Sequence, residues 1–178
     1  YGTGAAEELG MGPSARAGEM LGGPIESTAA EGEAMRAYMG DSYDTYLDAV
    51  RAQVPASDPR WSMLTEAEMV AVYGYTTSDY KFLNPAMRSL DPMQLAELMP
   101  YIATAQSGLC KMPNLGDLQG GEATTRRGMD ALSPELSAQL MPGMTFTDNA
   151  FMSTSMTDGV LDTFNGGVAI EVIGTSGV

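Results

Sequence analysis

The chain has 178 residues, of which 9 are Lys or Arg and 23 are Asp or Glu, so its formal charge at neutral pH is −14. Such a field repels nucleic acid and anionic lipid surfaces, and we expect neither as a partner. The sequence has no His and a single Cys, Cys110. This excludes a Ser-His nucleophile pair and an internal disulfide framework, and we expect no metal site and no membrane span.

The first half of the chain is predicted to be helical after an irregular start. Residues 1 to 32 are rich in Gly, Ala, Ser and Glu and lack periodicity, which indicates a linker or surface arm. Residues 33 to 54 carry apolar side chains at helical spacing, which predicts one amphipathic helix. Thr65 and Glu68 have the spacing of a capping box, which predicts a helix from there through about Tyr73.

Two further helices are predicted before the character of the sequence changes. Thr77 or Ser78 can cap a helix, although Pro85 removes one backbone donor and is expected to bend or restart it. A helix over residues 92 to 107 follows, and Gly108 is a plausible stop for it.

From about Leu118 onward, short β-prone runs alternate with Gly and Pro. A short helix from Ser133 or Pro134 to Leu140 fits between the first two runs. Helices first and strands later predict an α+β fold rather than a parallel sheet with crossover helices. The predicted strands cover residues 123 to 127, 144 to 146, 150 to 155 and 168 to 173.

Two short segments carry the residues suited to binding a dinucleotide. The first is Thr125-Arg126-Arg127-Gly128 and the second is Ser153-Thr154-Ser155. A guanidinium suits a pyrophosphate because its planar fork donates two parallel hydrogen bonds and keeps its charge. In a strand the two arginines point to opposite faces, so one of them faces the site, and alternation likewise puts both serines on one face.

In this order, the two segments resemble the NAD-binding core of the arginine-serine-glutamate class of mono-ADP-ribosyltransferases. The resemblance covers roughly residues 34 to 178 and includes a Tyr-Thr, Tyr, Asn, Leu-Arg-like pattern at residues 75 to 88, as in the helical lobe of bacterial toxins. It implies a domain over residues 33 to 178, with a helical lobe at about 33 to 110 and a split two-sheet β core at about 118 to 178.

The resemblance also implies an activity and assigns roles. NAD is the expected substrate, and ADP-ribose is transferred to a side chain of an acceptor protein with release of nicotinamide. Arg127 is the expected NAD-binding arginine because it directly precedes Gly128, although Arg126 stands where the family often has an aromatic residue. Ser153 is expected to orient the catalytic glutamate, and Thr154 and Ser155 complete the NAD-binding set.

The family's third element, a glutamate motif on a later strand, is not in the sequence, which predicts that the C-terminal strands of the core are missing. Glu171 is disfavoured as a substitute for the catalytic glutamate, because its strand predicts a side chain that points to solvent. Two alternatives stay open: an inactive structural or interaction protein with this fold, for example a virion component, and an NAD glycohydrolase. The family implies secretion or delivery into a host cell, and the sequence does not indicate the oligomeric state.

Overall fold

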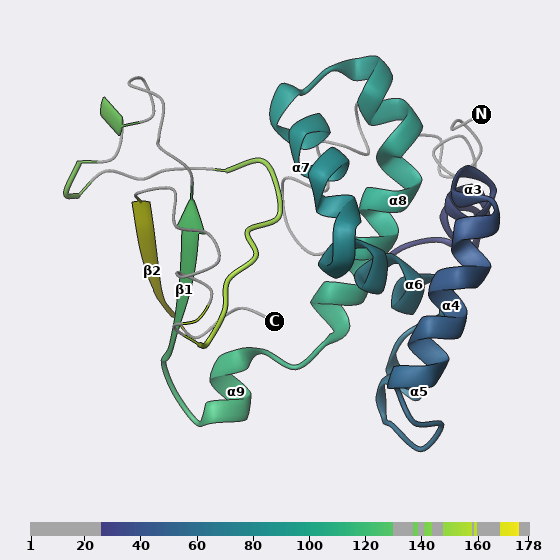
Figure 1. Cartoon of the computed structure of the whole chain (residues 1–178), viewed down its shortest axis with the longest axis horizontal. Coiled ribbons are helices and arrows are strands. Elements are labelled where there is room, and N and C mark those ends of the chain that lie inside the picture. Colours follow the sequence, from purple (N-terminus) through teal and green to yellow (C-terminus); the bar gives the residue numbers. More distant parts are fainter. Residues whose placement is uncertain are drawn as a thin grey trace. The chain divides into compact units, whose positions relative to one another are not determined.

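The computed structural model describes residues 26 to 129, 137 to 138, 141 to 143, 148 to 157, 159 and 168 to 174. They fall into two compact units, a helical unit within Tyr1–Met112 and a β unit within Pro113–Val178. Figure 1 shows helices through the first unit and two paired strands in the second, so the predicted α+β class is confirmed.

Seven helical segments of the described residues build the helical unit, and one short helix opens the β unit. In chain order they are α3 (Ala29–Met39), α4 (Asp41–Gln53), α5 (Arg60–Met63), α6 (Glu66–Gly74), the π-helix η1 (Tyr75–Asp79), α7 (Tyr80–Ser89), α8 (Pro92–Lys111) and α9 (Leu115–Gln119).

The chain becomes helical earlier than predicted, because a second capping box lies at Thr28 and Glu31. The Glu31 amide donates to Thr28 Oγ1 at 3.2 Å, and the Thr28 amide donates to Glu31 Oε2 at 2.7 Å. Residues 29 to 32 therefore belong to α3 rather than to an arm, and residues 1 to 25 lie outside the described part. The single helix predicted over residues 33 to 54 is also wrong, since Gly40 has a positive φ of 55° and separates α3 from α4.

The capping box predicted at Thr65 and Glu68 is confirmed. The Thr65 amide donates to Glu68 Oε2 at 2.8 Å, and the Glu68 amide donates to Thr65 Oγ1 at 3.2 Å, so α6 begins where the pattern predicted. The cap predicted at Thr77 or Ser78 is wrong. The backbone stays helical from α6 through η1 into α7, because a single π turn joins the two helices without a break.

Gly108 does not end α8, which continues to Lys111. A Cβ atom on Gly108 would lie 2.8 Å from Val72 Cγ2 and 3.2 Å from Glu68 Cβ, both on α6. The glycine is therefore placed where two helices pack closely, and the stop predicted from its presence is wrong.

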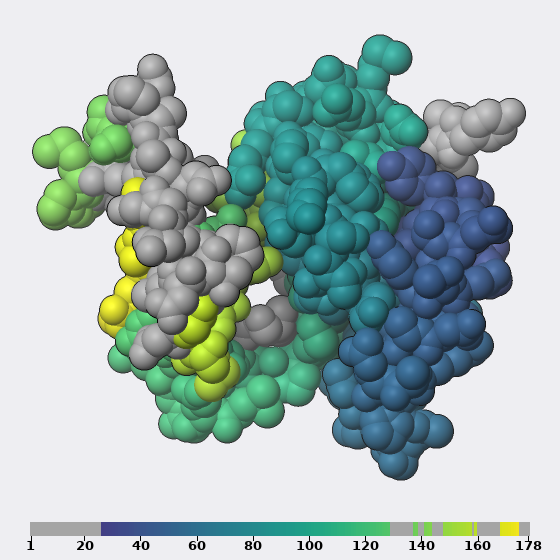
Figure 2. Space-filling view, viewed as in Figure 1, coloured from purple at the N-terminus to yellow at the C-terminus, as the bar shows by residue number. Residues whose placement is uncertain are grey.

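The core of the helical unit lies around α6 and α8. Helix α6 packs against α3, α4 and α8, and α8 also packs against α3 and α7. Figure 2 shows the teal residues of α7 and α8 forming a continuous surface with the purple and blue residues of α3 to α5. The largest fully buried apolar side chains of the described residues are Tyr101, Met35, Leu83, Ile102 and Val70.

The β unit contains an antiparallel pair, β1 (Ala123–Met129) and β2 (Val168–Gly174), drawn side by side in Figure 1. The strands predicted at residues 123 to 127 and 168 to 173 are confirmed. The strand predicted at 144 to 146 lies outside the described residues, as does the helix predicted over 133 to 140 except for residues 137 and 138, which are helical. The split two-sheet core stays a prediction.

The strand predicted at residues 150 to 155 is wrong. Residues 151 to 154 have no strand pairing, and Ser155 alone forms an isolated antiparallel bridge with Arg126. The preceding chain is held differently, because Asp148 Oδ1 accepts a hydrogen bond from the Ala150 amide at 3.1 Å, as in an Asx-turn.

Candidate functional site

The β unit brings Arg127 and Ser153 together, although 26 positions separate them in sequence. Arg127 Nη1 donates a hydrogen bond to the main-chain carbonyl oxygen of Ser153 at 3.0 Å. The contact joins β1 to the serine segment through a side chain on one partner and the backbone on the other. The two motifs singled out in the sequence therefore meet.

The register of the sheet explains which arginine makes this contact. Arg127 lies opposite Ile170, and Arg126 lies opposite Glu171. Opposed residues of an antiparallel pair share a face, and neighbours along a strand alternate. Arg127 thus shares its face with the buried Thr125, which is 9% exposed. Arg126 projects from the other face, as the alternation predicted.

Arg126 has structural partners on its own face and along its backbone. Its Nη2 lies 3.9 Å from Glu171 Oε1, an ion pair between partly exposed side chains. Its main chain exchanges two hydrogen bonds with Ser155, of 2.7 Å and 2.8 Å. Arg126 therefore fixes the edge of the sheet, while Arg127 reaches across it.

The serine segment is held by hydrogen bonds to its backbone, at the Ser153 carbonyl and at Ser155, and it is not a regular strand. Ser153 and Thr154 have exposed side chains. The Ser155 hydroxyl lies 3.1 Å from Thr157 Oγ1 and accepts a hydrogen bond from the Thr157 amide at 3.1 Å, so it closes a local turn. Because the segment is not a strand, strand alternation does not place both serines on one face.

The helical unit contains a buried polar cluster around Asp79, the last residue of the π turn. Tyr101 donates to Asp79 Oδ2 at 2.7 Å, and Tyr46 and Ser78 donate to Asp79 Oδ1 at 3.1 Å and 2.8 Å. Burial, and then the hydrogen bond to the Asp79 carboxylate, raise the pKa of Tyr101 far above its usual value. The carboxylate is 9% exposed, so these donors offset the loss of water. No sequence motif indicates this cluster.

Tyr75 and Asn84 form a second buried polar contact close to the π turn. Asn84 Nδ2 lies 3.5 Å from the Tyr75 hydroxyl, and both residues are less than 5% exposed. Among the described residues, Asn84 Oδ1 has no hydrogen-bond partner. Tyr75 is thus a packed residue of the helical unit.

A buried carboxylate at Glu68 links α6 to the end of α8. Glu68 Oε1 accepts hydrogen bonds from Ser107 Oγ, from Lys111 Nζ at 2.8 Å and from Ser27 Oγ at 3.2 Å. Burial alone would raise the pKa of Glu68, but the hydrogen bonds with Lys111, Ser107 and the Thr65 amide hold it below its usual value. This arrangement stabilises the fold and is separate from the arginine-serine contact.

Within the described ranges, no group of three or more Cys, Asp or Glu side chains is placed to hold a metal ion. Among the described helices, none is both long and apolar enough to cross a bilayer.

The fold resembles that of Exoenzyme S from Pseudomonas aeruginosa, whose structure was solved in complex with human 14-3-3 protein beta and bound to carba-NAD. The TM-score is 0.60 over 84% of this chain and 66% of that chain, with 23% sequence identity. At this identity the likeness concerns the fold.

Two proteins named NAD(+)–protein-arginine ADP-ribosyltransferase Tre1 are similar in sequence. The one from Pseudomonas putida strain GB-1 is 31% identical over 138 residues, which is 75% of this chain and 26% of the relative. The one from Serratia proteamaculans strain 568 is 38% identical over 134 residues, which is 74% of this chain and 28% of the relative. The chain thus spans about a quarter of the length of these relatives, and no family model matches it. The resemblance to mono-ADP-ribosyltransferases is confirmed.

Proposed function

We propose that the protein transfers ADP-ribose from NAD to a protein side chain, with arginine as the acceptor. The observation that carries the proposal is the contact between Arg127 and the Ser153 carbonyl, which joins the two halves of the arginine-serine motif. The names of the two sequence relatives, both protein-arginine ADP-ribosyltransferases, support the same reaction and acceptor.

The chemistry sets what the site must do. Breaking the bond between nicotinamide and ribose passes through an oxocarbenium-like state, so an enzyme must hold the dinucleotide and stabilise the developing positive charge. NAD supplies the ADP-ribosyl group when bound. In this chain, Arg127 holds its pyrophosphate, and Gly128 leaves room because it has no side chain.

The contact with Ser153 prepares Arg127 for this role. An arginine has five N–H donors, and the bond to the Ser153 carbonyl uses one of them. It orients the guanidinium and leaves further donors of the fork for an anion. Because Arg127 lies on the less exposed face of β1, its charge acts on a bound phosphate with less screening than on the opposite face.

The serine segment supplies the second part of the proposed site. Ser153 and Thr154 have exposed side chains, so their hydroxyls can contact a ribose or nicotinamide. We keep Ser153 as the residue that orients the catalytic carboxylate, and Ser155 as a contributor through its backbone and its local turn. Glu171 is not assigned as that carboxylate, because it pairs with Arg126 on the face opposite Arg127.

A pair of matched substitutions tests the proposal. Arg127→Lys keeps the charge but removes the planar fork, and we expect NAD binding to weaken by about 1 to 3 kcal/mol, the range for a lost charged hydrogen bond. Arg126→Lys is the control, since this side chain projects from the other face. Calorimetry with NAD measures both, and equal losses in the two variants would contradict the assignment of Arg127.

An assay with labelled NAD distinguishes the three candidate activities. Incubation with labelled NAD and candidate acceptor proteins labels an acceptor if the protein is a transferase. An NAD glycohydrolase releases nicotinamide and free ADP-ribose without labelling any protein. An inactive structural or interaction protein does neither, and that outcome would reject the proposed activity. Delivery into another cell, or association with a virion, belongs to the proposal too, and fractionation of producing cultures and particles tests it.

A further inference from the structure

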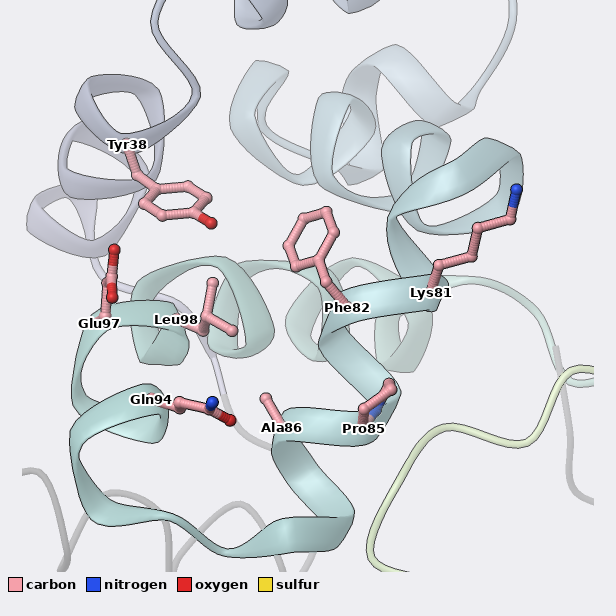
Figure 3. Close-up of a pocket in the computed structure, with 8 residues that line it drawn as sticks. All are labelled: Tyr38, Lys81, Phe82, Pro85, Ala86, Gln94, Glu97 and Leu98. Atoms are coloured by element: carbon pink, nitrogen blue, oxygen red, sulfur yellow. The ribbon is translucent and has the colours of Figure 1, made fainter.

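A pocket in the helical unit is lined by residues of α3, α7 and α8 and has a volume of about 400 Å³. Figure 3 shows its residues, which are Tyr38, Lys81, Phe82, Pro85, Ala86, Gln94, Glu97 and Leu98. No residue of the Arg127 or Ser153 segments is among them.

Two aromatic rings form the upper part of the pocket. In Figure 3, Tyr38 from α3 and Phe82 from α7 project toward the same space, with Leu98 of α8 below them. Tyr38 is 44% exposed and Phe82 is 38% exposed, so both rings present surface to a ligand. The ring of Phe82 is held edge-on by Tyr101, with centroids 6.3 Å apart. Aromatic faces carry a negative potential that attracts cations.

The charges at the pocket favour a positively charged ligand. Glu97 is exposed at the rim, and no salt bridge to it occurs among the described residues. Burial, and then the negative charge of Glu97, raise the pKa of Tyr38, so the phenol stays neutral and remains a cation acceptor. Lys81 is the cation among the described lining residues. Its side chain points away from Glu97 in Figure 3, with Nζ 5.9 Å from the centroid of the Tyr80 ring.

The size and lining of the pocket suit one long, amphipathic side chain. Its volume is at the small end of the range for ligand sites. An arginine has an apolar stem that packs on Leu98 and Ala86, and a planar guanidinium that stacks on aromatic rings and pairs with a carboxylate. The formal charge of the whole chain, −14, favours the approach of a basic partner.

We propose that this pocket anchors an arginine side chain of a basic protein partner, with Tyr38 and Phe82 flanking the guanidinium and Glu97 pairing with it. The partner is the acceptor protein, and that part of the inference rests on the proposed function. The anchored arginine is a docking residue that holds the acceptor, and it is distinct from the arginine that is modified.

A binding experiment tests the pocket without any enzymatic reaction. A fluorescent hexa-arginine peptide is titrated with the protein and with Glu97→Gln, Phe82→Leu and the control Asp48→Asn, and anisotropy is measured. Asp48 is an exposed residue of α4 outside the pocket lining, so its substitution removes one negative charge without touching the lining. We expect Glu97→Gln and Phe82→Leu each to weaken binding roughly threefold to tenfold, and Asp48→Asn to have little effect. Equal weakening by Glu97→Gln and Asp48→Asn would overturn the proposal.

Phe82→Leu keeps the apolar bulk against Tyr101 and removes only the ring face. If its Tm falls, Tyr38→Leu replaces it, because Tyr38 is the more exposed wall. A Tyr38→Leu protein with unchanged Tm and unchanged peptide binding would also overturn the proposal.

A kinetic experiment tests the identity of the partner separately. Transfer to a small guanidino compound such as arginine methyl ester is compared with transfer to a protein acceptor. We expect Glu97→Gln to raise KM for the protein acceptor roughly threefold to tenfold, with kcat and the rate on the small compound unchanged. An unchanged KM, with weakened peptide binding, would reject the acceptor as the partner. If the unsubstituted protein transfers to neither, the proposed function fails while the peptide titration still decides the pocket.

Discussion

Gly74 lies where side chains of the Asp79 cluster come very close to its α carbon, so its replacement by alanine gives a stringent test of that cluster. A Cβ atom at this position would overlap the Tyr101 hydroxyl and would lie 2.8 Å from Tyr46 Cε2 and 2.9 Å from Asp79 Oδ2. The backbone of Gly74 is ordinary right-handed helix, with φ −59° and ψ −47°, so an alanine is not strained by conformation. The destabilising part of the effect of Gly74→Ala therefore comes from the collision.

The size of the effect follows from three contributions. Overpacking a buried site costs about 1 to 3 kcal/mol, and disrupting the hydrogen bond from Tyr101 to the Asp79 carboxylate costs about 1.5 to 3 kcal/mol. Alanine recovers about 1 kcal/mol of helix propensity relative to glycine. We expect a net loss of about 1.5 to 5 kcal/mol in the free energy of unfolding.

Urea unfolding followed by far-ultraviolet circular dichroism measures this loss. With a slope of about 2 kcal/mol per molar urea, the midpoint should fall by about 0.8 to 2.5 M. Gly121→Ala is the matched control, because nothing lies within 4 Å of a Cβ atom there and Gly121 has no positive φ. A Gly74→Ala protein as stable as the Gly121→Ala protein would refute the reasoning and would mean that Tyr101 and Asp79 do not lie as described.

Two further predictions concern carboxylates in the helical unit. Glu68→Gln should lower the free energy of unfolding by about 2 to 3 kcal/mol at neutral pH, because it weakens charge-assisted bonds to buried donors. The folded-state pKa of Glu68 is depressed below 4.5, so the stability that the Glu68 carboxylate contributes is fully present above that pH and is lost as the pH falls through the folded-state pKa. Urea unfolding of the unsubstituted and Glu68→Gln proteins should therefore show a smaller difference in stability at acid pH than at neutral pH. The hydrogen bonds from Arg60 lower the pKa of Asp58 from 3.8 to about 2, and a carboxyl NMR titration should find a midpoint there. Arg60→Met should move that midpoint back toward 3.8. An unchanged midpoint would contradict the pairing of Asp58 with Arg60.

The sequence by itself determined those helix ends and strands that depend on residues close together in the chain. The capping box at Thr65 and Glu68 predicted the start of α6, because two reciprocal hydrogen bonds within four residues define a helix end. The same pattern is present in the sequence at Thr28 and Glu31, but the composition of that segment predicted an arm instead of a helix start. The strands β1 and β2 followed from short β-prone runs.

Glycines and serines were misread where their role depends on distant neighbours. Gly40 splits a predicted helix, and Gly108 is internal to one because α6 packs against it. A glycine permits both a stop and a close approach, and only the packed partner decides between them. The serine segment was predicted as a strand, but Ser155 alone finds a backbone partner on β1.

The candidate site divides in the same way. Residue types, their order along the chain and the family resemblance were enough to single out Arg127 and Ser153 as candidates. Alternation along a strand is a property of the backbone itself, and it predicted that the two arginines point to opposite faces. That the guanidinium reaches a carbonyl, and not a hydroxyl, depends on where the chain returns 26 residues later. The Asp79 cluster and the pocket at Tyr38, Phe82 and Glu97 join residues from three helices with no shared motif. Contacts between elements distant in sequence are set by packing of the whole unit, so only the tertiary structure decided them.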